Sequence, residues 1–128
     1  MNPSDVIRVD LKGGASKRIE TLPTTFGANV CTILRGGSRQ GFAVAPGPLK
    51  GYPPWVRVFD LDGAMVSEFV AYDDEGACGA NLGSVDVDGD GTDELIVGDG
   101  VGTSLPGKVR IHRLDGTLVA QWEAYSKF

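Results

Sequence analysis

The amino-acid sequence predicts an all-β protein built from repeated strand units. Nineteen glycines and seven prolines supply turns, and no window longer than a few residues shows clean helical periodicity. Strand-like segments flank Asp62-Gly63 and Asp115-Gly116, and Asp-Gly between two such segments is the strongest short hairpin signal. These two hairpins lie 53 residues apart and have similar flanks, so the chain also repeats itself.

The repeat extends over most of the chain. Val56–Gly63 returns as Val109–Gly116 at an offset of 53 residues, and Gly27–Asn29 returns as Gly79–Asn81 at an offset of 52. A period near 50 residues with strand-like content is typical of a propeller or a solenoid array. The sequence therefore predicts a stack of similar four-stranded units.

The elements follow in order from this division. Residues 1–26 form an N-terminal half-unit with two strands, 27–78 form the first repeat and 79–128 form the second, each with four strands. Alternation such as that of Val56 and Val58 with Arg57 and Phe59 is the period of a half-buried strand. The expected strands are 7–13 and 17–22, then 29–34, 42–46, 55–61 and 64–72, then 81–86, 94–98, 107–114 and 117–125.

The loop before the strand at 94–98 carries carboxylates at alternate positions. Asp86, Asp88, Asp90 and Glu94 occupy its first, third, fifth and ninth positions, and the intervening glycines let the backbone bend so that the side chains converge. The carbonyl of Thr92 is placed to add a backbone oxygen. Oxygen ligands of this kind suit a hard divalent cation, so the loop predicts a Ca²⁺ site.

Two other kinds of loop share part of this pattern. An EF-hand also begins with alternating Asp residues, but it needs a bidentate Glu at position 12 and flanking helices, whereas Val97 stands here between strand-like flanks. An Asp- and Gly-rich run is otherwise often a solvated turn. In the first repeat the matching positions are neutral (Leu34, Gly36, Ser38 and Phe42), so we expect one metal site, with Gly36-Gly37 preserving the loop shape.

The repeats resemble the FG-GAP/VCBS family of β-propeller repeats, and integrin α-chain propellers carry a similar loop. The resemblance rests on Gly79–Asn81, on Asp86–Gly98 and on Val109–Gly116, and it covers residues 27–125. It implies antiparallel four-stranded blades, a structural Ca²⁺ and a non-catalytic role in adhesion or recognition. The absence of acidic ligands from the first repeat departs from the family pattern.

The number of units then raises a question of closure. About two and a half blades fall short of the four to eight of a closed propeller, and stacked repeats need neighbours to bury their faces. We expect self-association into a ring or filament, or docking on a larger partner. A collapsed ten-stranded barrel or sandwich is the alternative.

Composition restricts the partners. The net charge of −5 disfavours nucleic acid, and no apolar run has the length that spans a bilayer. Residues 1–26 lack the apolar stretch of a signal peptide. We nevertheless expect an extracellular, particle-associated or surface-associated location.

The histidine, the two cysteines and one aromatic segment are expected to have mainly structural roles. His112 is expected on the surface of its strand, and with no second acid–base group beside it we expect no enzyme activity. Cys31 and Cys78 are either buried thiols or one disulfide. Tyr52-Pro53-Pro54-Trp55 is a packed corner or an aromatic contact surface for a glycan or another subunit.

The remaining aromatic residues recur between the repeats. Phe69 and Tyr72 match Trp122 and Tyr125, which indicates packing between units. The sequence thus favours a non-enzymatic, calcium-stabilised interaction module. A structural subunit of an extracellular filament, surface layer or virion is the first alternative, and an accessory fragment of a carbohydrate-active enzyme is the second.

Overall fold

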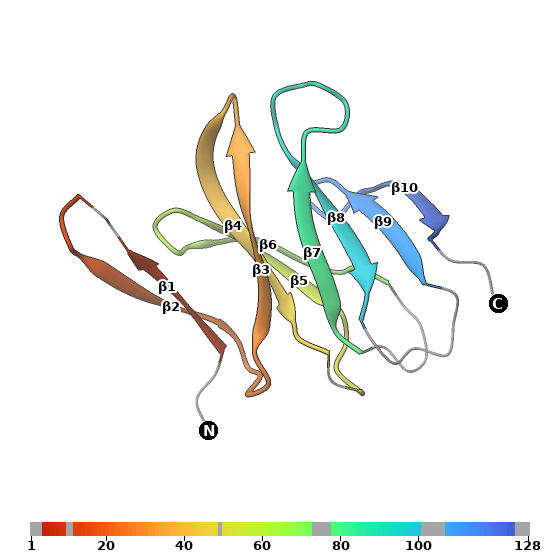
Figure 1. Ribbon diagram of the computed structural model, residues 1–128, viewed down its shortest axis with the longest axis horizontal. Coiled ribbons are helices and arrows are strands. Elements are labelled where there is room, and N and C mark those ends of the chain that lie inside the picture. Colours follow the sequence, from red (N-terminus) through yellow and green to blue (C-terminus); the bar gives the residue numbers. More distant parts are fainter. Residues whose placement is uncertain (1–3, 10–11, 49, 73–77, 101–106, 125–128) are drawn as a thin grey trace.

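The computed structural model describes residues 4–9, 12–48, 50–72, 78–100 and 107–124. These residues form ten strands in three antiparallel sheets, with no helix among them (Figure 1). The prediction of an all-β fold is confirmed. None of the described segments forms a helix long and apolar enough to cross a membrane.

The three sheets follow the order of the chain. The first sheet has two strands and the others have four, and within each sheet every strand is paired with its neighbour in sequence. Short hairpins produce this order because they return the chain directly alongside the preceding strand. The first sheet pairs β1 (Ser4–Val9) with β2 (Ser16–Leu22). The middle sheet contains β3 (Ala28–Arg35), β4 (Ser38–Pro46), β5 (Trp55–Asp60) and β6 (Met65–Val70), and the last sheet contains β7 (Ala80–Val85), β8 (Glu94–Asp99), β9 (Lys108–His112) and β10 (Leu118–Glu123).

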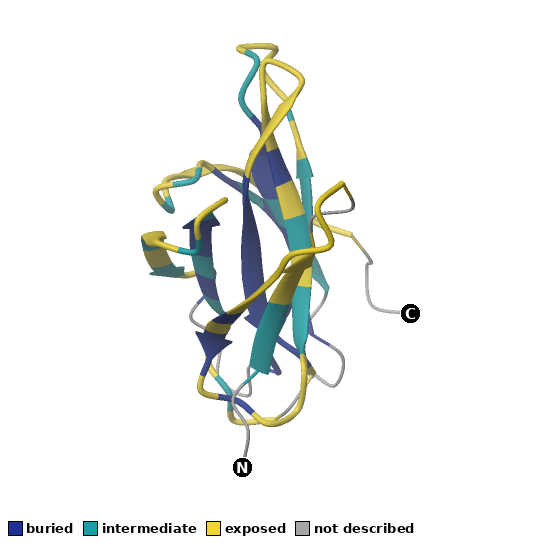
Figure 2. Cartoon of the chain, turned by 90° about the vertical axis from the view of Figure 1, so that its left-hand side faces the viewer, coloured by how far each residue is buried: buried dark blue, intermediate teal, exposed yellow. Residues whose placement is uncertain are grey.

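The core lies between the sheets, and the two central strands of the middle sheet, β4 and β5, are largely buried on both faces. Along β4, Phe42 and Val44 pack toward the first sheet, while Ala43 and Ala45 pack toward the last sheet. This follows from the two-residue period of a strand, which sends successive side chains to opposite faces. Figure 2 shows these buried strands between more exposed outer segments.

The Asp-Gly hairpin turn of each four-stranded sheet packs on the outermost strand of the sheet before it. Gly63 has φ 87°, and a Cβ built there would lie 3.0 Å from the side chain of Ile19 in β2. Gly116 has φ 93°, and a Cβ there would lie 2.7 Å from Cγ of Phe69 in β6. The contact between the first and middle sheets therefore recurs between the middle and last sheets. Both turns favour glycine through their positive φ, and at Gly116 the approach to Phe69 is also closer than a Cβ allows.

The turn of the first repeat differs from the expectation. Ile33 pairs with Gly41, as Val85 pairs with Glu94, so Gly41 rather than Phe42 corresponds to Glu94. The connection at 34–40 is one residue shorter than that at 86–93.

The prediction that Gly36-Gly37 preserves the loop shape is consequently wrong. Both glycines have positive φ, 57° and 74°, and form a tight two-residue turn that lets Leu34 and Arg35 continue β3.

The prediction that His112 lies on the surface is also wrong. Its side chain is buried, its ring centroid lies 5.1 Å from that of Phe69, and Nδ1 lies 3.1 Å from the carbonyl oxygen of Gly116. The face of β9 that carries His112 is covered by the middle sheet, whereas the opposite face carries Ile111. Alternation along a strand separates the two faces but does not show which of them meets a neighbour.

The predicted aromatic positions fall in different settings. Phe69 is partly buried against the core, Tyr72 is buried within it, and Trp122 is 48% exposed on β10. Tyr125 lies outside the described residues. At the corner that contains Tyr52 and Trp55, the ring of Tyr52 makes an edge contact with the exposed ring of Phe26.

Candidate metal centre

The acidic loop joins β7 to β8 and is shaped by its two glycines. Gly89 and Gly91 have φ values of 78° and 88°, in the left-handed region that side chains with a Cβ rarely adopt. These two residues turn the chain back so that Asp86, before the bend, comes close to Glu94, after it. The sequence pattern thus folds locally as predicted.

Three carboxylates converge inside this loop. Asp86, Asp88 and Glu94 each offer an oxygen, and the three oxygens lie within 4.8 Å of one another. Backbone amides hold all three side chains: Asp86 accepts from Gly89 N at 2.7 Å and from Gly91 N at 2.9 Å, Asp88 Oδ1 accepts from Asp90 N at 3.1 Å, and Glu94 Oε2 accepts from Val87 N at 3.0 Å. The acidic triad, Asp86, Asp88 and Glu94, could therefore hold a metal ion.

The other two predicted ligands are placed differently. Asp90 is not part of the triad, and its Oδ1 accepts from Thr92 N at 2.7 Å, which closes a local turn. Thr92 forms an isolated antiparallel bridge with Arg35 at the end of β3. Both residues thus shape the loop and its contact with the middle sheet, and whether they also coordinate an ion stays a prediction.

The loop is hydrogen-bonded to the hairpin between β3 and β4. Gly36 N donates to the carbonyl of Gly91 at 2.6 Å, and Asp93 N donates to the carbonyl of Leu34 at 3.0 Å. Asp93 Oδ2 in turn accepts from Leu34 N at 2.9 Å. Sequence reasoning did not assign Asp93 a role, since its partner lies 59 residues away and no local pattern indicates such a contact.

The electrostatics of the triad favour a cation. Carboxylate oxygens 4.8 Å apart repel each other by about 0.9 kcal/mol per pair even in water, and by more in a partly buried site. Glu94 is buried and Asp88 is partly exposed. One cationic side chain approaches, with Arg113 Nη2 3.4 Å from Asp88 Oδ2 at the surface. An all-oxygen anionic donor set fits a hard divalent ion.

A second polar cluster lies in the interior and is structural. Arg110 Nη1 lies 2.6 Å from Asp99 Oδ1, with both side chains about 95% buried, and the guanidinium carbon lies 4.6 Å from the ring centroid of Tyr72. Burial raises the pKa of Tyr72, which keeps its hydroxyl protonated. The same hydroxyl is hydrogen-bonded to the backbone at Gly79 and Gly100, so the cluster ties the base of the last sheet together.

Cys31 and Cys78 do not form a disulfide with each other. Cys31 lies on β3 beside the core, and burial raises its pKa from 9.0 to about 11. Cys78 is buried ahead of β7 and pairs in a single parallel bridge with Tyr52. A raised pKa suppresses the thiolate, which is the reactive form, so Cys31 is unsuited to nucleophilic chemistry.

Comparison with known proteins finds no relative of this chain. No protein-family model, no curated protein and no solved structure matches this chain. Any function assigned to this chain must therefore be argued from the chemistry of the acidic loop and from its contacts within the fold.

Proposed function

We propose that the chain is a non-enzymatic, Ca²⁺-stabilised module of β-propeller type that associates through the faces of its sheets. The observation that carries this proposal is the position of the acidic triad. It lies on a loop whose backbone is hydrogen-bonded to the neighbouring sheet through Gly36, Gly91 and Asp93. An ion that orders this loop would therefore strengthen the contact between two stacked units.

Asp86, Asp88 and Glu94 would hold the ion. Ca²⁺ would supply positive charge that cancels the mutual repulsion of the three carboxylates. The chain itself orients the donors, since amides of the loop fix Asp86 and Glu94. Ca²⁺ is favoured over Mg²⁺ because it tolerates the irregular, flexible coordination of such a loop, whereas Mg²⁺ requires a stricter octahedron and more water.

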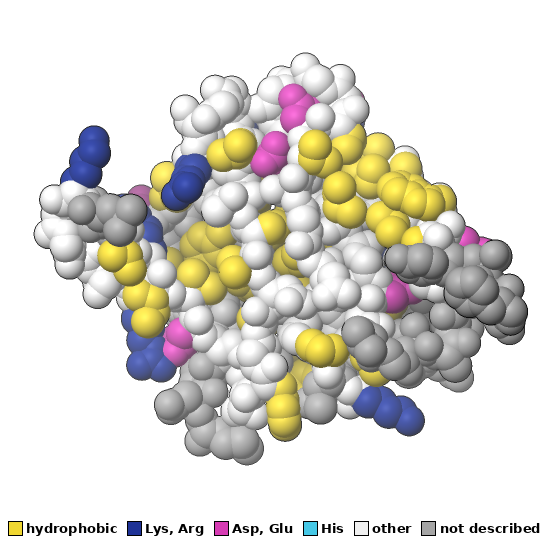
Figure 3. All heavy atoms as spheres, viewed as in Figure 1, with side chains coloured by type: hydrophobic (Ala, Val, Ile, Leu, Met, Phe, Trp, Pro, Cys, Tyr) yellow, Lys and Arg dark blue, Asp and Glu magenta, His cyan; other side chains and the backbone are white. Residues whose placement is uncertain are grey.

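The faces of the sheets support association. The face of the middle sheet that meets the last sheet carries Val56, Val58 and Ala43, each at most 3% exposed. The equivalent residues of the last sheet, 53 positions later, are Val109, Ile111 and Ile96, and they are only partly buried. Trp122 replaces Phe69 on the same face and is 48% exposed. Hydrophobic side chains gather over this part of the molecule in Figure 3.

The opposite end also has an apolar face. In β1, Val6 packs toward the middle sheet, while Ile7 and Val9 are exposed at 63% and 55%. Large exposed apolar surfaces mark interaction sites in soluble proteins. Two unlike open faces permit head-to-tail contact, which closes a ring or extends a filament.

Thermal unfolding with Ca²⁺ and with a chelator tests the metal site. An ion that binds only the folded state adds about 2.7 kcal/mol at a hundredfold excess over its Kd. For a chain of this length we expect a rise in Tm of roughly 10 °C. Asp88→Asn should abolish the rise, because it removes one of three negative donors but keeps an oxygen for Asp90 N. In chelator the same variant should melt at or above the wild-type temperature, since two repulsive pairs are lost.

Asp62→Asn is the matched control, because Asp62 is an exposed turn aspartate outside the triad. It should respond to Ca²⁺ as the wild type does. A wild-type protein that melts at the same temperature in Ca²⁺ and in chelator would show that the loop holds no ion.

Sedimentation velocity in Ca²⁺ tests association. Trp122→Glu places a charge on the open face of the last sheet and should shift the protein to monomer. Val70→Glu is the control, because Val70 is equally exposed at 51% on the outermost strand of the middle sheet. A wild type that remains monomeric at high concentration, or two variants that behave alike, would contradict a role of this face.

A further inference from the structure

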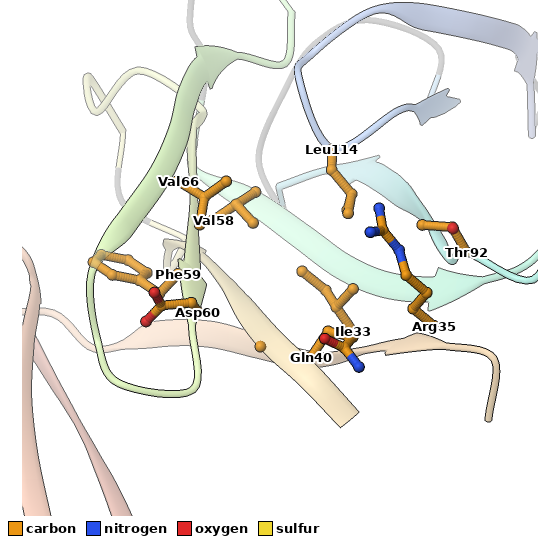
Figure 4. A pocket seen from close by; sticks show the side chains of 10 residues that line it. Ile33, Arg35, Gln40, Val58, Phe59, Asp60, Val66, Thr92 and Leu114 are labelled. Carbon is orange, nitrogen blue, oxygen red and sulfur yellow. The ribbon is translucent and has the colours of Figure 1, made fainter. Parts of the chain in front are cut away.

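A cleft separates the middle sheet from the turn region of the last sheet. It has a volume of about 150 Å³, and its walls include the aliphatic side chains of Ile33, Val58, Val66 and Leu114. A cavity of about this size with apolar walls accommodates a molecule such as benzene. Figure 4 shows the cleft from close by.

Two β-bulges supply lining residues. In the pairing of β3 with β4, Leu34 faces Arg39 and Ile33 faces Gly41, which leaves Gln40 without a partner residue. In the pairing of β5 with β6, Val66 is left out in the same way. Both bulged residues line the cleft. Bulges redirect side chains and are frequent beside functional sites. The pairing of β7 with β8 shows no such irregularity, so the Gln40 bulge is specific to the middle sheet.

One side of the cleft carries polar groups that the described residues do not satisfy. Neither the Arg35 guanidinium nor the Gln40 amide has a hydrogen-bond or ion-pair partner among the described residues. The carboxylate of Asp60 also lines the cleft, but its Oδ1 accepts from Asp62 N and Ala64 N in its own turn. Figure 4 shows Arg35 reaching toward Leu114, with Val58 and Val66 on the other side.

The acidic loop does not take up the Arg35 guanidinium. Asp90, Asp93 and Glu94 line an adjoining groove together with Arg35. Each of these carboxylates accepts from a backbone amide instead, from Thr92 N, Leu34 N and Val87 N. None of the described carboxylates forms an ion pair with Arg35, so its guanidinium is available to an external anion.

We propose that this cleft binds a small organic acid whose carboxylate meets Arg35 and Gln40 and whose ring or branched aliphatic group enters the apolar part. Guanidinium groups bind carboxylates with two parallel, charge-assisted hydrogen bonds. The amide of Gln40 can donate a further hydrogen bond. The wall of Ile33, Val58, Val66 and Leu114 accepts an apolar group of limited size. This proposal does not depend on the metal site.

Titration with phenylacetate, followed by the backbone amide shifts in nuclear magnetic resonance spectra, tests the proposal. We expect saturable shifts at Ile33, Val58 and Leu114. Phenylacetamide, which keeps the ring but lacks the charge, and acetate, which lacks the ring, should both bind much more weakly. The titration is run in Ca²⁺ and in chelator, so that failure of the metal site and failure of the cleft are seen separately.

Matched variants locate the binding site. Arg35→Gln should weaken phenylacetate binding by roughly tenfold to a hundredfold, because charge-assisted hydrogen bonds are lost. Arg39→Gln, on the same hairpin but outside the cleft, should leave binding unchanged. Val66→Trp should fill the cleft and prevent binding while preserving the dispersed spectrum of a folded protein.

Three results would overturn the proposal. The first is the absence of saturable shifts in both buffers. The second is equal affinity of Arg35→Gln and wild type. The third is equal binding of phenylacetate and phenylacetamide, since the charge would then have no role.

Discussion

The packing of Gly116 on Phe69 allows a quantitative test of how the sheets fit together. Gly116 combines φ 93° with a position where a Cβ would lie 2.7 Å from Phe69 Cγ and 2.8 Å from Phe69 Cβ. Gly116→Ala therefore introduces two separate costs. A left-handed backbone costs an alanine about 1–2 kcal/mol, and forcing a methyl group into a packed contact costs about 1–3 kcal/mol.

The expected loss in the free energy of unfolding is thus roughly 2–5 kcal/mol. For a chain of this length it corresponds to a fall in Tm of roughly 8–20 °C. Gly51→Ala separates the two costs, because Gly51 has a similar φ of 88° with no atom within 4 Å of the added Cβ. This control should lose only about 1–2 kcal/mol.

Urea unfolding at constant Ca²⁺ measures both variants. A double variant that combines Gly116→Ala with Phe69→Leu should lose less than the sum of the two single losses, because the smaller side chain relieves the clash. The reasoning would be refuted if Gly116→Ala and Gly51→Ala lost the same free energy, or if the double-variant losses were additive. Either result would mean that the turn of the last sheet does not pack on β6.

Two further predictions concern buried charges and thiols. Because the pKa of Cys31 is raised from 9.0 to about 11 in the folded protein, its contribution to stability is complete below pH 9 and is lost as the pH rises through 11. Urea unfolding should show that the wild type loses up to about 3 kcal/mol of its free energy of unfolding over this pH range, whereas Cys31→Ala should not. Equal pH profiles of the two proteins would contradict this prediction. Asp99→Asn should lower the free energy of unfolding by about 3–5 kcal/mol, because it removes a buried negative charge paired with Arg110. The double variant Asp99→Asn with Arg110→Met should recover part of that loss in the same assay. A loss below about 1 kcal/mol in Asp99→Asn alone would rule out an energetically important ion pair.

The order of the strands could be read from the chain because its signals are local. Asp62-Gly63 and Asp115-Gly116 specify tight turns through backbone preferences within a few residues, and alternation identifies the strands on either side. Ten strands were expected and ten are present in the described residues. The convergence of Asp86, Asp88 and Glu94 was also predictable, since the alternating acids and the glycines between them lie within nine residues.

The errors concern matters that local signals do not specify. In the comparison of the two repeats, Glu94 corresponds to Gly41 rather than to Phe42, and this is decided by how β3 pairs with β4 and β7 with β8. Shape complementarity also decided the setting of His112, because a buried position arises only when another sheet lies over that face.

The sequence alone determined the fold class, the hairpins and an oxygen-rich loop, because each depends on interactions among residues close together in the chain. Only the tertiary structure decided that this loop is hydrogen-bonded to Leu34 and Gly36, that Gly116 fits against Phe69 and that Arg35 faces an apolar cleft. These contacts join residues about 50 positions apart, and they form only when one sheet stacks on the next. The physical reason is that a strand has two faces of similar composition, and packing determines which of them is covered.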